Sequence, residues 1–305
     1  MRRGWRRFRR NEAAVPATIG LGALVLFCLV APPISPYDPY KVDFSQKLEL
    51  PSLQHWMGTD FFGRDLLERM ALGGRLSMFI ALVAIVIILV LGLVYGTIAG
   101  AVGGKLDELM MRGLDALFAI PRLPGILIIL VLIGENGNVF TVILALSLFS
   151  WMTTARLVRG QIVSLKQNDY VRAARALGAR RHQVVVRHIV RNMFGILLVA
   201  VVLELPGVIL NEAFISVLGL GINPPTATWG NIAHDALGLS NAYFLVLPSV
   251  AIALFAIAVN FVADGLQDAL DPRRESIGAT TAWSPLQGFL RPAARVTEPS
   301  PGSVQ

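Results

Sequence analysis

Residues 76–102 read LSMFIALVAIVIILVLGLVYGTIAGAV, a stretch without a single charged side chain. A helix of about 20 mainly apolar residues crosses the hydrocarbon core of a bilayer, so this stretch is long enough to span a membrane. The chain of 305 residues is 54% hydrophobic and only 15% charged, with a mean hydropathy of +0.62. Such values lie outside the usual range of soluble domains. The sequence therefore predicts an all-α membrane protein.

Four further stretches are long and apolar enough to cross a bilayer. One of them contains two acidic residues, Glu204 and Glu212, and the other three are almost free of charge. The first follows a run of arginines, as a signal peptide does, but it lacks a clean small-residue cleavage site and is predicted to remain as an anchor. These stretches are residues 13–34, 138–155, 195–217 and 243–264.

The weakest candidate span is 118–134, because Pro121, Arg122 and Pro124 stand near its start. If it does not cross, the loop 156–192 falls on the outer side, against the tendency of basic residues to remain inside. Proline is tolerated in the first turn of a helix, and an arginine near a helix entrance can extend to the interface. Six transmembrane helices are therefore predicted, with both termini cytoplasmic. The basic residues of the loop are Arg156, Arg159, Lys166, Arg172, Arg175, Arg180, Arg181, Arg187 and Arg191.

This topology divides the rest of the chain between the two sides of the membrane. The transmembrane domain 76–266 has spans at about 76–100, 118–134, 138–155, 195–217 and 243–264, with the loop 156–192 inside. Residues 1–12 form a basic cytoplasmic segment, and the tail 267–305 is rich in Pro, Ser, Thr and Ala and is predicted to be disordered. Only five of the 27 lysines and arginines fall outside, namely Lys41, Lys47, Arg64, Arg69 and Arg75.

The outer segment 35–75 changes character along its length. Prolines mark its beginning, whereas Leu66, Leu67, Met70 and Leu72 recur near helical spacing at its end. This part is expected to be an amphipathic helix lying against the membrane surface.

The loop 156–192 contains a second amphipathic pattern. Tyr170, Ala173, Ala174 and Leu177 follow i, i+3, i+4, i+7 spacing and therefore share one face of a short helix. Two alanines at the centre of that face allow close backbone approach to another surface. The pattern favours a helix that docks into a groove on a partner protein.

Glycine and basic residues complete this pattern. Gly178 suits a left-handed helix terminus, and a second basic helix, with Val184, Val185 and Ile189, leads from it into the next span. The face opposite the alanines holds basic residues, and the same arrangement fits a helix lying on anionic lipid. The pattern alone leaves the protein groove and the lipid surface open as alternatives. The basic residues on the opposite face are Arg172 and Arg175.

Residues 169–179, DYVRAARALGA, resemble the coupling motif of permeases of binding-protein-dependent ABC importers, in which Glu-Ala-Ala is followed four residues later by glycine. Other segments resemble the second, C-type permease of the dipeptide, oligopeptide and nickel group. These matches run in one order from the first span to about Arg273. They are HWMGTD at 55–60, GRD at 63–65, ARLVRGQ at 155–161, LGLG at 218–221, PP at 224–225, WGN at 229–231, and DGL and DALDP within 264–272.

The resemblance implies a type I ABC-importer permease architecture and a translocation subunit for di- or oligopeptides, with nickel chelates or glutathione as alternatives. It also implies partners: a second homologous permease, two ATPase subunits or one fused ATPase, and an extracytoplasmic solute-binding protein. ATP and Mg²⁺ are expected in the ATPases, and no cofactor is expected in this chain. The residues implied in ATPase coupling are Tyr170, Arg172, Ala173, Ala174, Leu177 and Gly178.

Two positions depart from the family pattern. Arg172 stands where the family usually has Glu, so an acidic contact to the ATPase is removed. Arg191 stands where the second half of the motif usually has proline, so the helix can continue more smoothly into the fifth span. These departures leave the expected permease assignment in place and alter the expected polar contacts.

Glu204 and Glu212 lie within a predicted span. They are slightly more than two helical turns apart and so share one face. An ionisable group there costs a few kcal/mol unless it faces protein or water. Glu212 is expected to have a capping or packing role, with a place on the pathway as the alternative. Glu204 precedes Pro206-Gly207, where a kink would let it line a watery pathway and attract a peptide amine; a structural role is its alternative.

Other classes of protein fit the sequence less well. The basic residues alternate with apolar runs instead of covering one face, which argues against nucleic-acid binding. The single cysteine, Cys28, excludes a disulfide within the chain. An enzyme is not expected, because Gly103-Gly104-Lys105 lacks the remaining residues of a phosphate loop and the histidines fall outside the spans. A secondary transporter would need more buried charge and usually a repeat. The histidines are His55, His182, His188 and His234.

Overall fold

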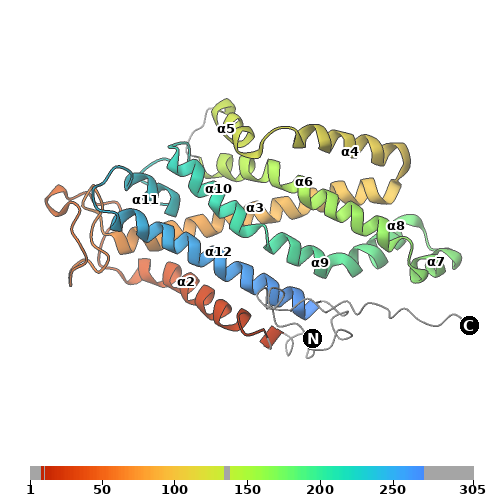
Figure 1. The fold of residues 1–305 in the computed structure, drawn as a ribbon, viewed down its shortest axis with the longest axis horizontal. Helices are drawn as coiled ribbons and strands as arrows, with labels where there is room; N and C mark the ends of the chain where they lie inside the picture. Colours follow the sequence, from red (N-terminus) through yellow and green to blue (C-terminus); the bar gives the residue numbers. More distant parts are fainter. Residues whose placement is uncertain (1–7, 10, 134–137, 271–305) are drawn as a thin grey trace, which may run out of the picture. The chain divides into compact units, whose positions relative to one another are not determined.

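A computed structural model describes residues 8–9, 11–133 and 138–270 of this protein (Figure 1). Residues up to Leu270 belong to one structural unit. Most of the predicted basic segment 1–12 and nearly all of the predicted tail 267–305 lie outside the described residues.

The described part of the chain is helical, as the sequence predicted. Five helical segments are long and apolar enough to cross a membrane, and a bent pair of helices brings the number to six. The helices are α2 (Ala14–Ile34), α3 (Leu66–Val102), α4 (Gly104–Phe118), α5 (Arg122–Ile133), α6 (Val139–Leu165), α7 (Asp169–Ala176), α8 (Arg181–Gln183), α9 (Arg191–Val202), α10 (Leu205–Val217), α11 (Trp229–Asp235) and α12 (Tyr243–Leu270), with a 3₁₀-helix η1 (Phe44–Gln46) and a π-helix η2 (Val184–Val190).

The bent pair corresponds to the weakest predicted span. The structure has no single helix over 118–134: α4 ends at Phe118, α5 begins at Arg122, and the two axes differ by 84°. The Ala119 amide still bonds to the Asp115 carbonyl, whereas Pro121 has no amide to donate and precedes a new helix. At about 18 Å, α5 alone is shorter than the hydrocarbon core. In Figure 1 the pair together returns the chain toward the start of α6, and by length and composition the two helices together qualify as one broken span.

Helix α3 begins earlier than the span predicted from the sequence. Residues 66–75 do not form a separate helix lying against the membrane surface but are the first turns of α3, and Leu66 and Met70 are buried. Asp65 fixes this start because its side chain accepts a hydrogen bond from the amide of Glu68, 2.9 Å away. Hydropathy detects the apolar part of a helix and not its capped end, so the prediction wrongly separated these helical turns from the span.

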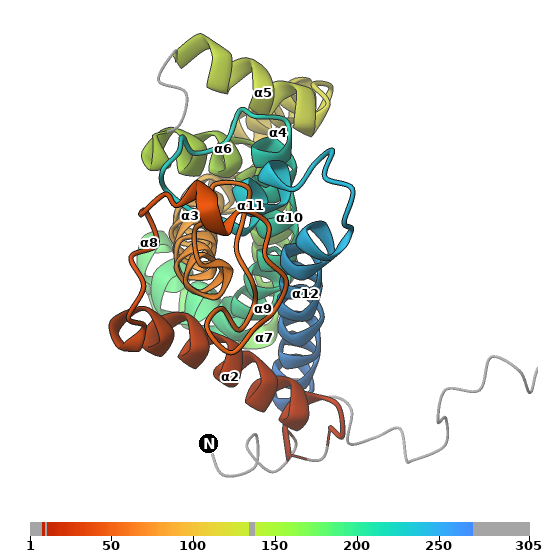
Figure 2. The ribbon, with the colours of Figure 1, turned by 90° about the vertical axis from the view of Figure 1, so that its left-hand side faces the viewer.

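Close packing between α3 and α6 forms the centre of the bundle. In the end-on view of Figure 2, α3 lies among α2, α6, α10 and α11, all of which it contacts. A Cβ atom on Gly96 would lie only 2.4 Å from the backbone oxygen of Ala155, so the two backbones approach closely. Gly92 and Gly100, one turn away on either side, also face α6. Such glycine spacing is typical of packed membrane helices.

The two ends of the bundle differ. The loop end carries residues 35–65 and α11, and the opposite end, here named the α7 end, carries α7 and α8 (Figure 1). Candidate sites lie at both ends and at mid-depth between them.

Candidate functional site

At the α7 end, a short helix forms where the sequence predicted it. Asp169 lies in the first turn of α7, where a negative charge stabilises a helix, and it forms an ion pair with Arg172. The helix ends in a Schellman arrangement: the Ala179 amide donates to the Ala174 carbonyl over 3.1 Å, and Gly178 has φ of +85°. The left-handed terminus predicted at Gly178 is therefore present.

The predicted face of α7 is only partly covered by the rest of the chain. Tyr170 and Ala173 are exposed, and Leu177, directly after the helix, is 88% exposed. Ala174 is half-buried and packs against the core. The anchor of α7 is Val171, which is fully buried. The sequence reasoning missed Val171 because it lies outside the chosen i, i+3, i+4 pattern.

Polar contacts connect α7 to the following span. The amide group of Asn192 donates a hydrogen bond to the Tyr170 hydroxyl, at 3.3 Å. The π-helix η2 continues directly into α9 at Arg191, as expected where a proline is missing. An open hollow lies beside α7 and is bordered mainly by basic and polar side chains, namely Tyr170, Arg187, His188, Arg191 and Asn192.

At the loop end, the HWMGTD and GRD segments fold back on themselves. Asp60 accepts hydrogen bonds from the amides of Phe62, at 2.8 Å, and Arg64, at 3.0 Å. The imidazole of His55 lies 2.8 Å from the Asp65 carboxylate, and both side chains are buried. These matched residues therefore build the loop and the start of α3.

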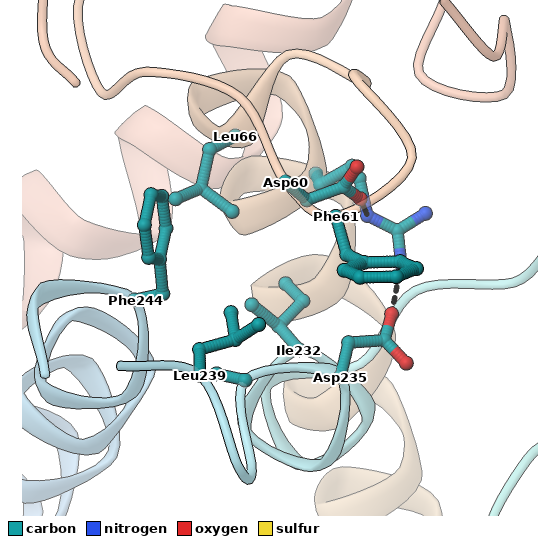
Figure 3. Close-up of a pocket in the computed structure, with 9 residues that line it drawn as sticks. Asp60, Phe61, Leu66, Ile232, Asp235, Leu239 and Phe244 are labelled. Atoms are coloured by element: carbon teal, nitrogen blue, oxygen red, sulfur yellow. Dashed lines mark hydrogen bonds and ion pairs between the residues drawn. The ribbon is translucent and has the colours of Figure 1, made fainter. Parts of the chain in front are cut away.

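Two arginines connect this loop to α11. The Asp60 carboxylate lies 2.7 Å from Nε of Arg64 and 3.1 Å from Nε of Arg69. Asp235 at the end of α11 is 3.2 Å from Arg64 and 3.4 Å from Arg69. Figure 3 shows Asp60 and Asp235 beside a small pocket lined by Phe61, Leu66, Ile232, Leu239 and Phe244.

The charges of this network are largely removed from water. The two arginines are buried, and Asp235 is partly buried. Burial raises the pKa of the Asp235 carboxyl, against the opposing effect of Arg69 and then Arg64. No role was predicted for these residues. Asp60 and Arg64 lie inside the matched segments HWMGTD and GRD, which could have signalled them, whereas Arg69 and Asp235 lie outside every matched segment.

Glu212, a possible pathway residue for which a capping or packing role was expected, is held between three helices. It is 1% exposed and accepts hydrogen bonds from Ser216, at 3.0 Å, and from Ser77 on α3, at 3.2 Å. The Ser77 hydroxyl also accepts from the amide of Trp229, at 3.2 Å, the first residue of α11. This geometry is that of a packing residue.

Glu204, the other predicted pathway residue, lies at a break in the fifth span. Helix α9 ends at Val202 and α10 begins at Leu205. The Glu204 carboxylate is 4.0 Å from a guanidinium nitrogen of Arg122, at the start of α5. A second nitrogen of Arg122 donates to the Ser150 hydroxyl on α6 over 2.6 Å. Glu204 and Glu212 thus have different surroundings although their spacing predicted a common face.

Comparisons with known proteins agree with this architecture. Residues 92–276 match the family described as binding-protein-dependent transport system inner membrane component. Residues 1–51 match the N-terminal TM domain of oligopeptide transport permease C.

Individual relatives cover most of the chain. It is 39% identical to the oligopeptide transport system permease protein OppC of Haemophilus influenzae, over 88% of this chain and 87% of that protein. It is 40% identical to OppC of Escherichia coli, over 88% and 89% of the two chains. It is 36% identical to the dipeptide transport system permease protein DppC of Bacillus subtilis, over 88% and 84%.

A solved structure supports the fold. The inward-facing MetNI methionine ABC transporter has a chain that aligns with a TM-score of 0.57 and 18% identity, covering 65% of this chain and 94% of that one. The family match over residues 92–276, together with the permease relatives that cover most of the chain, shows that it belongs to the binding-protein-dependent transport system inner membrane components and is a multi-pass permease subunit of the ABC transporter class.

Proposed function

We propose that this chain is the translocation subunit of an ATP-driven importer of di- or oligopeptides. The support is the set of relatives named as oligopeptide and dipeptide permeases, which match 88% of the chain at 36 to 40% identity. The chain would work with a second homologous permease, with two ATPases or one fused ATPase that bind ATP and Mg²⁺, and with an extracytoplasmic solute-binding protein.

In this proposal the α7 end faces the cytoplasm, as do both termini. The support is the basic character of the loop 156–192, because lysine and arginine remain preferentially on the cytoplasmic side. The loop end then faces outward, where the binding protein would deliver the peptide.

The observation that carries the proposal is the exposed face of α7, formed by Tyr170, Ala173 and Leu177. A small helix with such a face fits a groove on an ATPase. Val171 and the contact between Asn192 and Tyr170 join α7 to its own chain, and η2 runs without interruption into α9. Movement of the ATPase would therefore be transmitted to the fifth span, because the ATPase contacts differ between its two states.

The test is the variant Ala173→Trp in the assembled transporter. A large indole on the exposed face should prevent close docking, so the ATPase should no longer copurify and ATP-driven import into proteoliposomes should be lost. The matched control is Ala116→Trp, at an exposed alanine on α4. Copurification and import at the wild-type level in Ala173→Trp would contradict the proposed coupling role.

A further inference from the structure

Arg122 and Glu204 place opposite charges at mid-depth in the bundle. Glu204 lies near the middle of the span Val184–Val217, and Ser150, which binds Arg122, lies near the middle of α6. Glu204 is therefore far from both ends of its span, and Arg122, the first residue of α5, contacts the middle of α6. The pair is therefore located where an ionisable side chain is most costly and usually functional.

The pair is loose and partly open. The nearest nitrogen and oxygen are 4.0 Å apart, longer than a charge-assisted hydrogen bond. The Arg122 side chain is 37% exposed and that of Glu204 is 25% exposed. The buried Nε of Arg122 has no hydrogen-bond partner within the described part of the chain. Both groups therefore keep the capacity to bind another charged partner.

The exposed side of the pair cannot favourably face lipid. A charge at mid-depth is stabilised by water, by protein or by an opposite charge, and lipid tails offer none of these. Both residues also stand at helix interruptions, one between α4 and α5 and the other between α9 and α10. Secondary transporters, a different class, commonly form substrate sites from interrupted helices at this depth, and the same physical reasons apply here: broken helices free backbone groups and make room for a ligand. The geometry fits the wall of a route through the membrane.

We infer that Arg122 and Glu204 bind the charged ends of a peptide during its passage. This inference rests on the proposed function. Arg122 takes the peptide carboxylate and Glu204 takes the peptide ammonium group. A free peptide carries both charges, so it can replace the loose pair by two closer ion pairs without leaving a charge unpaired.

A double-mutant cycle separates binding from a purely structural role. The variants Arg122→Gln, Glu204→Gln and the double variant are reconstituted with the partner subunits, and import of a free tripeptide is measured. Each single variant should import about tenfold more slowly, the effect of losing a charge-assisted hydrogen bond. The double variant should be at least as slow as either single variant. If the double variant recovers wild-type import, Arg122 and Glu204 serve only to neutralise each other's charge, and the inference is wrong.

Blocked peptides identify which residue binds which end. Relative to wild type, Glu204→Gln should slow import of a C-amidated peptide but not of an N-acetylated one, and Arg122→Gln should do the reverse. Equal slowing of both peptides in both variants would overturn the assignment. The matched control is Glu108→Gln, which removes an exposed carboxylate paired with Arg112 on α4 and should change none of these rates.

Assembly and the wild-type rate are checked in the same preparations. Each variant must retain the ATPase and the second permease on purification, so that a loss of import is not a loss of folding. Absence of import by the wild-type complex would instead contradict the proposed function, whatever the variants do.

Discussion

At the scale of single residues, glycine is required for two different reasons in this chain: a left-handed backbone conformation at one position and close helix packing at another. Gly178 has φ of +85° and open space around it, so only its backbone conformation limits substitution. Gly96 has an ordinary helical conformation and no space, so only its missing side chain matters. The sequence alone indicated the first case, because a glycine after a short helical pattern suits a left-handed terminus.

Replacement of Gly178 by valine should abolish import without preventing membrane insertion. A β-branched residue in the left-handed region costs at least about 1 kcal/mol and would shift the end of α7 away from the position that the proposed contact with the ATPase requires. The measurement is peptide uptake in proteoliposomes together with the amount of protein in the membrane fraction. The control is Gly22→Val on α2, where a side chain also meets open space but φ is not positive. Uptake by Gly178→Val at the control rate would count against this view.

At the scale of helices, hydropathy located the spans but not their ends. Helix α3 begins at Leu66, after its cap Asp65, and α6 runs to Leu165, well beyond the apolar stretches, because capping and continued backbone hydrogen bonding do not require lipid. The bend between α4 and α5 follows from Pro121; the sequence shows this proline but does not fix the direction in which the chain continues after it. Packing against α6 depends on the glycines at 92, 96 and 100, whose four-residue spacing is visible in the sequence.

Replacement of Gly96 by leucine should destabilise the bundle by about 2 kcal/mol, the usual cost of overpacking. The added Cβ alone would lie 2.4 Å from the Ala155 carbonyl oxygen, so α3 and α6 must separate. The measurement is the thermal unfolding midpoint in detergent. For Gly113→Leu the nearest atom to the new Cβ is the Tyr95 hydroxyl at 3.8 Å, so little change is expected. Equal midpoints for the two variants would refute close α3–α6 packing.

At the scale of the whole molecule, the proposed function puts the two ends of the bundle on different sides of the membrane. A thiol label tests this assignment directly, because Cys28 is the single cysteine and is buried. In a Cys28→Ala background, Leu177→Cys at the α7 end should react with a membrane-impermeant reagent only after the cytoplasmic face is opened. Leu53→Cys at the loop end is 97% exposed and should react in intact cells. Reaction of Leu177→Cys in intact cells would reverse the proposed orientation.

The sequence by itself determined the membrane class, the spans and the amphipathic helix α7. These features depend on residues close together in the chain, whose spacing fixes which side chains share a face. Only the tertiary structure decided which charges meet. Arg69 and Asp235 are far apart in sequence, as are Arg122 and Glu204, and their pairing depends on how separate helices pack. The tertiary structure also decided that Glu212 is buried and Glu204 is partly exposed. The burial of a side chain depends on the neighbouring segments that pack against it and not on its spacing along one helix.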